Sequence, residues 1–288
     1  MLFICKKMAA IKPTELNALI NSPLFDAGLN AFSAQFDADR LDMLQRSRDA
    51  GVAYQLCIAS DLAEAELNLQ LCAQFPDLLT TAGVHPHQAA RVEPGWLEQL
   101  THLVQRPDVC AVGECGLDFN RMFSPQELQI DVFQQQLQLA TTVNKAVYLH
   151  ERDAFDTQIS LLKAHQIHHG IAHCFTSSQH ELAAYVDLGL YIGITGWVCD
   201  ERRGAALQDA VRYLPLDRLI LETDAPYLLP RNLATKPKSR RNEPAFLMAI
   251  AEMVAHLKQC PLEQVLNAAW HNSCQLFNVE APDVATLA

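Results

Sequence analysis

The sequence contains no hydrophobic run long enough to cross a membrane. Its longest apolar runs have the length of a β-strand, whereas a membrane-spanning helix needs roughly 18 or more apolar residues. Residues 1–7 place two lysines beside a short apolar stretch that is too small for a secretory signal, and no cleavage pattern follows. We therefore expect a soluble protein that resides in the cytoplasm.

The sequence also lacks any C-x-x-C pair, although it contains nine cysteines. An odd number of cysteines in a long chain does not suit a disulfide framework, and most of them lie inside apolar runs or helical patterns. We expect free thiols in a reducing compartment.

Positive charge is scarce as well, since 22 Lys and Arg residues against 33 Asp and Glu residues give a net charge of −11. This balance argues against broad, charge-driven binding to nucleic acid. It does not exclude a nuclease, because a basic active-site face can coexist with acidic outer helices. Residues 227–242 fit that arrangement, with five basic residues and no acidic one.

Two periodicities alternate along the chain. Short, continuously hydrophobic runs are typical of parallel strands that are buried on both faces. Longer stretches with apolar residues at helical spacing separate them, for example 127–142 and 155–165, and two more follow at 244–256 and 262–277. The strand-like runs are residues 24–30, 53–60, 78–86, 109–118, 146–151, 170–175, 191–196 and 219–226.

Eight strand–helix units in order predict an α/β fold, a single (β/α)8 TIM barrel, for which a chain of 288 residues is long enough. A doubly wound open sheet is the alternative. We place the barrel domain at 24–278, an N-terminal extension at 1–23 and a loose tail at 279–288. Thr14 is positioned to open a short helix in the extension. No internal repeat or low-complexity tract occurs.

Four residues of metal-ligand type lie at or near the carboxyl ends of these runs: Glu114, His150, His173 and Asp224. The strands of a (β/α)8 barrel point their carboxyl ends at one face, so these residues are expected to meet there. Each has an ordinary alternative: a turn for Glu114, a hydrogen-bonded core position for a lone histidine, and a helix cap for Asp224. Two histidines on adjacent strands favour the metal site, because neighbouring strands lie about 4.8 Å apart.

His85 and His87 end the third run around a proline. We interpret His85 as supporting the site or contacting a substrate phosphate, although His-Pro-His also suits a plain turn.

Several ordered motifs together resemble the TatD-type metal-dependent deoxyribonucleases, from Phe25 to about Phe277. The motifs are Ala82-Gly-Val-His-Pro-His87, Val112-Gly-Glu-Cys-Gly-Leu-Asp118, His173-Cys-Phe-Thr176, Tyr191-Ile-Gly-Ile-Thr-Gly-Trp197, Glu222-Thr-Asp-Ala-Pro-Tyr-Leu-Leu229 and Arg240-Arg-Asn-Glu-Pro244. The stretches Gly116-Leu-Asp-Phe-Asn120 and Cys199-Asp-Glu-Arg-Arg-Gly204 are typical of one branch of that family.

The resemblance implies a barrel hydrolase that cleaves phosphodiester bonds with a divalent metal. Glu114, His150 and His173 match the family's metal ligands, and Asp224 matches the aspartate that ligates the metal or activates the attacking water. Mixed nitrogen and oxygen ligands suit Mn²⁺, Zn²⁺ or Mg²⁺, of which Mg²⁺ is the most abundant candidate in the cell. Our hypothesis gives Glu114 and Asp224 the catalytic roles, with Asp224 accepting the proton of the water.

The sequence departs from the family pattern at two places. The family generally carries Asp-x-His-x-His on its first strand, whereas this chain has Asp26-Ala-Gly-Leu-Asn30. One ion is therefore expected, and a second stays open. Glu151 replaces a cysteine of the family; its carboxylate either faces the barrel exterior or alters the charge near the metal.

Substrate contacts are expected from basic and aromatic residues in the loops after the strands. The candidates for phosphate binding are His85, Asn120, Arg202, Arg203, Arg240 and Arg241. The alternative for the arginines is a solvated loop, or salt bridges to Asp200, Glu201 and Glu243. Trp197, Phe119 or Tyr227 is expected to stack a terminal base.

A barrel face encloses a pocket, which favours action at a strand end. We predict a monomeric exonuclease on the ends of single-stranded DNA or RNA, with the 3′→5′ direction taken from the resemblance. One alternative is a small-molecule amide or ester hydrolase on the same scaffold, which usually relies on the first-strand histidine pair. The other is a catalytically weakened protein that binds nucleic acid or a partner.

Overall fold

The structure is a computed structural model that describes residues 23–280. The helix expected at Thr14 lies outside the described residues, as do most of the N-terminal extension and most of the C-terminal tail.

Eight parallel strands form one sheet in sequence order. Most of their side chains are buried, because helices cover one face of the sheet and the barrel interior covers the other. The strands are β1 (Leu24–Leu29), β2 (Val52–Cys57), β3 (Leu78–Ala82), β4 (Val109–Asp118), β5 (Ala146–Arg152), β6 (Gly170–Ala172), β7 (Tyr191–Ile194) and β8 (Leu219–Leu221).

The first strand and the segment after the last strand close the sheet into a barrel. Leu29 and Ala225 form a parallel bridge. The amide of Asn30 donates to the carbonyl oxygen of Ala225 at 2.8 Å, and the amide of Asp224 donates to that of Gly28 at 2.8 Å. The predicted (β/α)8 barrel is thus confirmed, and the open sheet is wrong.

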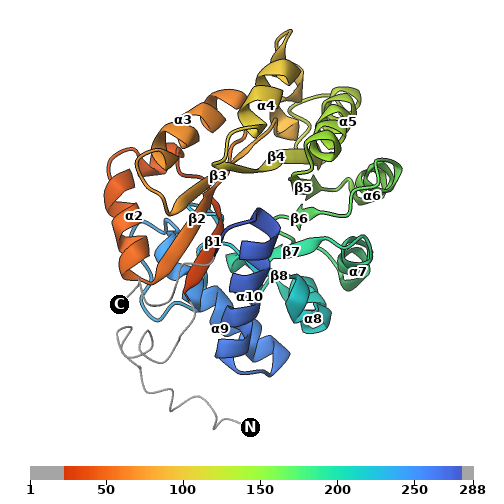
Figure 1. Cartoon of the computed structure of the whole chain (residues 1–288). Coiled ribbons are helices and arrows are strands. Elements are labelled where there is room, and N and C mark those ends of the chain that lie inside the picture. Colours follow the sequence, from red (N-terminus) through yellow and green to blue (C-terminus); the bar gives the residue numbers. More distant parts are fainter. Residues whose placement is uncertain (1–22, 281–288) are drawn as a thin grey trace.

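Helices surround the strands (Figure 1). They are α2 (Arg40–Asp49), α3 (Leu62–Cys72), α4 (Trp96–Val104), α5 (Gln126–Val143), α6 (Phe155–Ala164), α7 (Gln179–Asp187), α8 (Ala205–Tyr213), α9 (Leu247–Lys258) and α10 (Leu262–Phe277). Figure 1 shows α10 lying across one end of the barrel. Its Trp270 and Phe277 pack against Phe25 near the start of β1, at centroid distances of 6.2 and 5.7 Å. That end is therefore plugged, and the other end is left for a site.

Several strands end earlier than the hydrophobic runs predicted. β6 stops at Ala172 and β8 at Leu221, so His173 and Asp224 lie in the loops just beyond them. Single hydrogen bonds extend each ladder slightly, such as His173 N to Leu149 O at 2.9 Å. The hydrophobic runs overestimate the length of these strands because the residues that follow them remain buried in the barrel mouth. Burial alone does not distinguish a strand from a buried loop.

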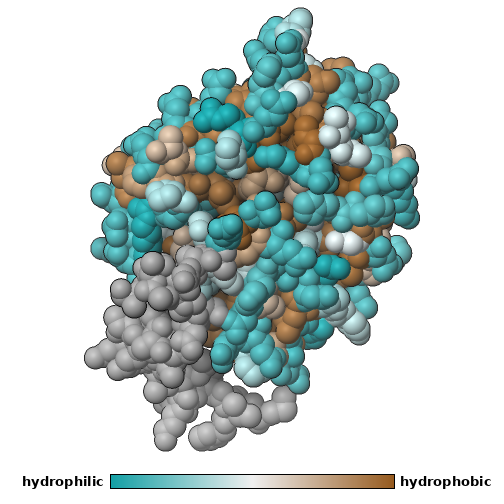
Figure 2. All heavy atoms as spheres, in the orientation of Figure 1, coloured by the Kyte–Doolittle hydropathy of each residue, from teal (hydrophilic) through white to brown (hydrophobic). Residues whose placement is uncertain are grey.

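The surface that Figure 2 shows is mostly polar, with small groups of hydrophobic residues between the polar ones. Among the helices of residues 23–280, none has both the length and the hydrophobicity that a membrane crossing requires.

Candidate metal centre

Glu114 sits on a β-bulge in β4. Gly113 pairs with Tyr148 of β5, and the next pair is Cys115 with Leu149, so Glu114 is an extra residue without a partner on β5. Gly113 has φ +150° and lies against the backbone of Tyr148, where a side chain would collide. We expected Glu114 at a strand end, but β4 continues to Asp118. The bulge turns the carboxylate inward without ending the strand.

Three imidazoles converge on one oxygen of Glu114. Its Oε1 lies 3.1 Å from His150 Nδ1, 3.6 Å from His85 Nε2 and 3.8 Å from His173 Nε2. Asp224 completes the group, with its Oδ1 4.0 Å from His173 Nε2. The structure thus brings together the four residues expected to bind metal, together with His85.

The potential ligand atoms form two groups whose members lie within 4.8 Å of one another: His85 with Glu114 and His150, and His173 with Cys174 and Asp224. Two ligand atoms that share an ion at about 2.1 Å lie about 3.0–3.4 Å apart in tetrahedral or octahedral geometry. The distance from Glu114 Oε1 to His150 Nδ1 lies in this range, whereas the distance to His173 Nε2 is longer, at 3.8 Å. An ion held by Glu114, His150 and His173 would therefore draw the two groups closer together.

The electrostatics of the centre also suit a cation. Burial opposes the charge on Glu114, but the hydrogen bond from His150 and the positive charges of His173 and His150 hold the pKa of the carboxyl well below its usual range. Burial likewise opposes charge on the other two ligand candidates. The hydrogen bonds to Asp118 and Glu114 nevertheless raise the pKa of His150 to about 9, and Glu222 above all raises that of His173 to about 10. The carboxylates around these imidazoles create a field that favours positive charge.

His85 differs from the other two histidines. Its Nδ1 accepts a hydrogen bond from the amide of His87 at 3.1 Å, so in the neutral ring the proton is on Nε2. Burial lowers the pKa of His85 to about 3, which keeps the ring neutral. His85 therefore presents an N–H group to the centre instead of a lone pair, as a phosphate contact would.

Asp118 is a site residue that the sequence analysis did not identify. Its Oδ2 lies 2.6 Å from His87 Nε2 and 3.4 Å from His150 Nε2. Asp118 thereby supports the ring of His150 on the side away from Glu114. The sequence signal that could have identified Asp118 is its position four residues after Glu114 in the same motif.

Asp224 is held at the centre by the first strand. Its Oδ1 accepts a hydrogen bond from the side-chain amide of Asn30 at 2.8 Å. The preceding Thr223 donates to buried Asp26 through its amide at 2.7 Å and its hydroxyl at 2.5 Å. Burial raises the pKa of Asp224 to about 6, although the positive charge of His173 opposes the shift. The helix-cap alternative for Asp224 is wrong, because no helix starts at this position.

The space beside Gly28 is filled. A Cβ atom at Gly28 would lie 2.7 Å from Glu222 Oε2 and 2.9 Å from Tyr148 Oη. Both side chains are buried, and the sequence analysis gave neither a role. Tyr148 lies two residues before His150 on β5, a spacing at which strand residues share a face. Glu222 lies two residues before Asp224 in the segment just after β8.

Glu151 caps the segment that leads into α6. Its Oε1 accepts a hydrogen bond from the amide of Ala154 at 2.7 Å. Glu151 also lines the cleft that His173 lines.

The arginines expected to bind phosphate have different environments. Arg202 is exposed, and its amide donates to Asp200 Oδ1 at 3.0 Å. Arg203 pairs with Asp200 at 3.0 Å and lies 4.5 Å above the ring of Trp197. This stacked pair borders a cleft of about 260 Å³ that His173 also lines. Arg203 is thus close to the centre.

Arg240 is exposed, whereas Arg241 is tied into an ion-pair network. Arg241 contacts Asp39 and Glu243, each at 2.7 Å. The salt-bridge alternative therefore describes the contacts of Arg241 in this structure. Asn120 is exposed and donates to Asp153 Oδ2 at 2.6 Å.

The aromatic residues expected to stack a base also differ in their surroundings. Trp197 lines the cleft beside His173. Tyr227 is 50% exposed, and Phe119 packs against the hydrophobic core. Trp197 is the aromatic residue placed best for a substrate near the centre.

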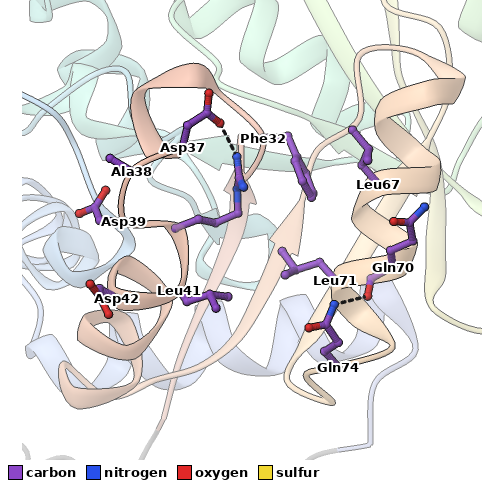
Figure 3. A pocket seen from close by; sticks show the side chains of 11 residues that line it. Phe32, Asp37, Ala38, Asp39, Leu41, Asp42, Leu67, Gln70, Leu71 and Gln74 are labelled. Carbon is purple, nitrogen blue, oxygen red and sulfur yellow. Dashed lines mark hydrogen bonds and ion pairs between the residues drawn. The ribbon is translucent and has the colours of Figure 1, made fainter.

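A second cleft, of about 500 Å³, lies between α2 and α3. Figure 3 shows Asp37, Asp39 and Asp42 around it, with Phe32 and Leu71 on the inner side. None of the metal-ligand candidates lines it, so the chemistry is to be sought at the barrel mouth.

A (β/α)8 barrel that gathers carboxylates and imidazoles beyond its strands has the arrangement of a metal-dependent hydrolase. Residues 25–278 match the model of the family described as TatD related DNase, and the chain belongs to this family. The resemblance seen in the motifs is thereby confirmed.

Individual relatives agree with the family match. A Rahnella sp. (strain Y9602) protein named 3′-5′ ssDNA/RNA exonuclease TatD is 49% identical, over 90% of this chain and 99% of that protein. A Salmonella typhimurium protein of the same name is 46% identical, over 81% of this chain and 90% of that protein. The crystal structure of a TatD homologue from Escherichia coli is 29% identical with a TM-score of 0.83, and the match covers 91% of this chain and 100% of that one.

Proposed function

We propose that this chain is a divalent-metal-dependent 3′→5′ exonuclease that hydrolyses phosphodiester bonds at the ends of single-stranded DNA or RNA. The observation that carries the proposal is the convergence of His85, His150 and His173 on Glu114 Oε1 at the open mouth of the barrel. The relatives named as exonucleases support the reaction type and direction.

In this proposal, Glu114, His150 and His173 hold the ion, which in the cell is Mg²⁺, with Mn²⁺ or Zn²⁺ able to replace it. When bound, the ion supplies positive charge against the phosphate oxygens and makes a water molecule nucleophilic near neutral pH. Asp224 accepts the proton of the attacking water, a role that its raised pKa suits. His85 donates a hydrogen bond from its Nε2–H group to a phosphate oxygen.

We propose a single ion because of what surrounds Gly28 and Asn30. Tyr148 and Glu222 fill the space into which a side chain at position 28 would extend. The side-chain amide of Asn30 directs an N–H group at Asp224, and a donor hydrogen in that place repels a cation. A second ion would therefore have to use the group of His173, Cys174 and Asp224, in which the Nε2 atom of His173 is already a ligand of the first ion.

The cleft beside His173 is the proposed place for the terminal nucleotide. Trp197 offers a stacking surface, and the guanidinium of Arg203 lies over it near a phosphate path. Arg202, Arg240 and Asn120 remain further candidates for phosphate contacts.

The test is nuclease activity together with metal binding in Glu114→Ala. We expect the variant to lose most of its Mn²⁺ affinity, measured by calorimetry, and most of its activity on a 3′-labelled single strand. Glu181→Gln is the control, because this carboxylate contacts Ser177 and Ser178 at the start of α7 and none of the ligand candidates. Unchanged binding and activity in Glu114→Ala would refute the metal centre. A protein that binds DNA but shows no turnover with any of the three metals would instead be the catalytically weakened alternative.

A circular single strand tests the exonuclease mode. We expect the linear form of the same sequence to be degraded much faster than the circle, because the pocket needs a free end. Equal rates would show an endonuclease.

We also propose a monomeric enzyme in the cytoplasm. One chain supplies every residue of the proposed centre, so a partner subunit is not required. The eight cysteines among residues 23–280 are all free, which suits a reducing compartment.

A further inference from the structure

Glu222 is a buried carboxylate that the mechanism above does not use. Its Oε2 lies 2.5 Å from His173 Nδ1 and accepts a hydrogen bond from Tyr148 Oη at 2.8 Å. Its Oε1 accepts one from the amide of Cys174 at 2.7 Å. The side chain of Glu222 has no exposure to solvent, and a buried carboxylate with three polar partners is fixed in place.

The contact with Glu222 decides which nitrogen of His173 carries a proton. An ionised carboxylate only accepts hydrogen bonds, so the Nδ1 atom that faces it must be protonated. The lone pair of the neutral ring is then on Nε2. That atom faces the centre, 3.8 Å from Glu114 Oε1 and 4.0 Å from Asp224 Oδ1.

Tyr148 and two glycines build the place for Glu222. The hydroxyl of Tyr148 also lies 2.7 Å from His173 Nδ1, and its contact with the carbonyl oxygen of Ala27 at 2.9 Å ties the tyrosine to β1. A Cβ atom at Gly193 would collide with the Glu222 carboxylate, and a Cβ atom at Gly28 would press on both side chains. The absence of side chains at these two positions makes room for the pair.

We propose that Glu222, held by Tyr148, is the positioning residue for His173, which it keeps in the tautomer and orientation that present Nε2 to the metal. This inference rests on the proposed metal centre. Carboxylates that hydrogen-bond a ligating histidine are a general means of orienting the ring, and their loss typically lowers metal affinity about 10- to 100-fold.

Glu222→Gln tests the proposal with little change in size. If the amide oxygen stays with Cys174 N, the amide nitrogen donates to His173 Nδ1 and forces the proton onto Nε2. We expect a Kd for Mn²⁺ that is about 10- to 100-fold higher by calorimetry. In the Zn²⁺-loaded wild type, the Nδ1 proton of His173 should give a protected downfield NMR signal, and this signal should be missing in Glu222→Gln.

Tyr148→Phe is the second variant, since it keeps the buried ring and removes only the hydroxyl. We expect a smaller, several-fold rise in the Kd for Mn²⁺, with the Nδ1 proton of His173 retained. Glu181→Gln is the matched control and should bind Mn²⁺ as the wild type does. Wild-type affinity in Glu222→Gln would overturn the proposal, whatever Tyr148→Phe shows. Thermal unfolding confirms that each variant is folded.

Glu114→Ala separates the two proposals. If this variant loses Mn²⁺ binding while Glu222→Gln keeps it, the metal centre stands and the positioning role of Glu222 fails. If Glu114→Ala itself binds Mn²⁺ normally, the metal centre fails.

Discussion

Substitutions at Gly28 test whether Tyr148 and Glu222 occupy the space of a side chain at that position. Restoring the family's histidine with Gly28→His is the direct perturbation. If the space were free, the histidine would add a metal ligand. Because the new Cβ atom would lie 2.7 Å from Glu222 Oε2 and 2.9 Å from Tyr148 Oη, we expect strain and no second ion.

The size of the effect on the free energy of unfolding can be worked out for Gly28→Ala. Gly28 is not among the residues with positive φ, so alanine should stabilise the protein by about 0.4–1 kcal/mol through the unfolded state. Both contacts of the new Cβ atom are shorter than real ones, and Glu222 is fixed by its partners, so overpacking should cost about 1–3 kcal/mol. The net expectation is a loss of about 1–2 kcal/mol, with Gly28→His losing more.

Thermal unfolding and a double-mutant cycle measure this effect. A loss of 1 kcal/mol should lower the midpoint by about 2 °C in a chain of this size. Tyr148→Phe removes one of the two atoms in conflict, so Gly28→Ala should cost less in that background, with a coupling of about 0.5 kcal/mol or more. Mn²⁺ stoichiometry in Gly28→His should stay at one.

Two outcomes would refute this reasoning. Gly28→Ala could prove as stable as the wild type with no coupling to Tyr148, which would mean that the space is not tightly filled. Alternatively, Gly28→His could bind two Mn²⁺ ions without loss of stability, and the single-ion proposal would then fail.

Three further predictions concern the centre and its surroundings. The raised pKa values of His150 and His173, about 9 and 10, mean that both rings are positively charged at pH 7 without the ion. Mn²⁺ binding should therefore release up to about two protons and strengthen as the pH rises from 6 to 8. Equal heats of binding in buffers of different ionisation enthalpy would contradict this. Arg241→Ala should lower the unfolding free energy in urea by about 1 kcal/mol, because Asp39 loses one of its two arginine partners and keeps Arg46. KM for a single strand should stay unchanged, and a raised KM would restore the role of Arg241 as a phosphate contact. Trp197→Ala should raise KM by the equivalent of about 1–3 kcal/mol, and Trp197→Phe should raise it less; equal effects would argue against stacking.

The sequence was sufficient to predict the barrel and the main members of the site. Parallel strands direct their carboxyl ends to one face whatever the loops do, so Glu114, His150, His173 and Asp224 could be placed together before any coordinates were known. The position of Glu114 within its strand could not be predicted, because a bulge depends on register with the neighbouring strand.

The supporting residues were harder to predict. Tyr148 lies in an apolar run and looks like an ordinary core residue. Its role appears only through a hydroxyl group that reaches Ala27 on β1 and Glu222 just after β8. The ion pair of Arg241 joins it to Asp39, 202 positions away. No local pattern connects residues so far apart, so the sequence left the solvated loop and the salt bridge equally open.

The bulge at Glu114 has a consequence for how this scaffold can change over evolutionary time. The pairing of β4 with β5 resumes at Cys115 and continues to Asp118 with Arg152, so the strand runs four residues beyond Glu114 before the loop starts. Insertions and replacements in that loop can reshape the rim of the pocket while the paired strands keep Glu114 in place. Substrate preference is thereby free to diverge while the hydrolytic chemistry stays fixed.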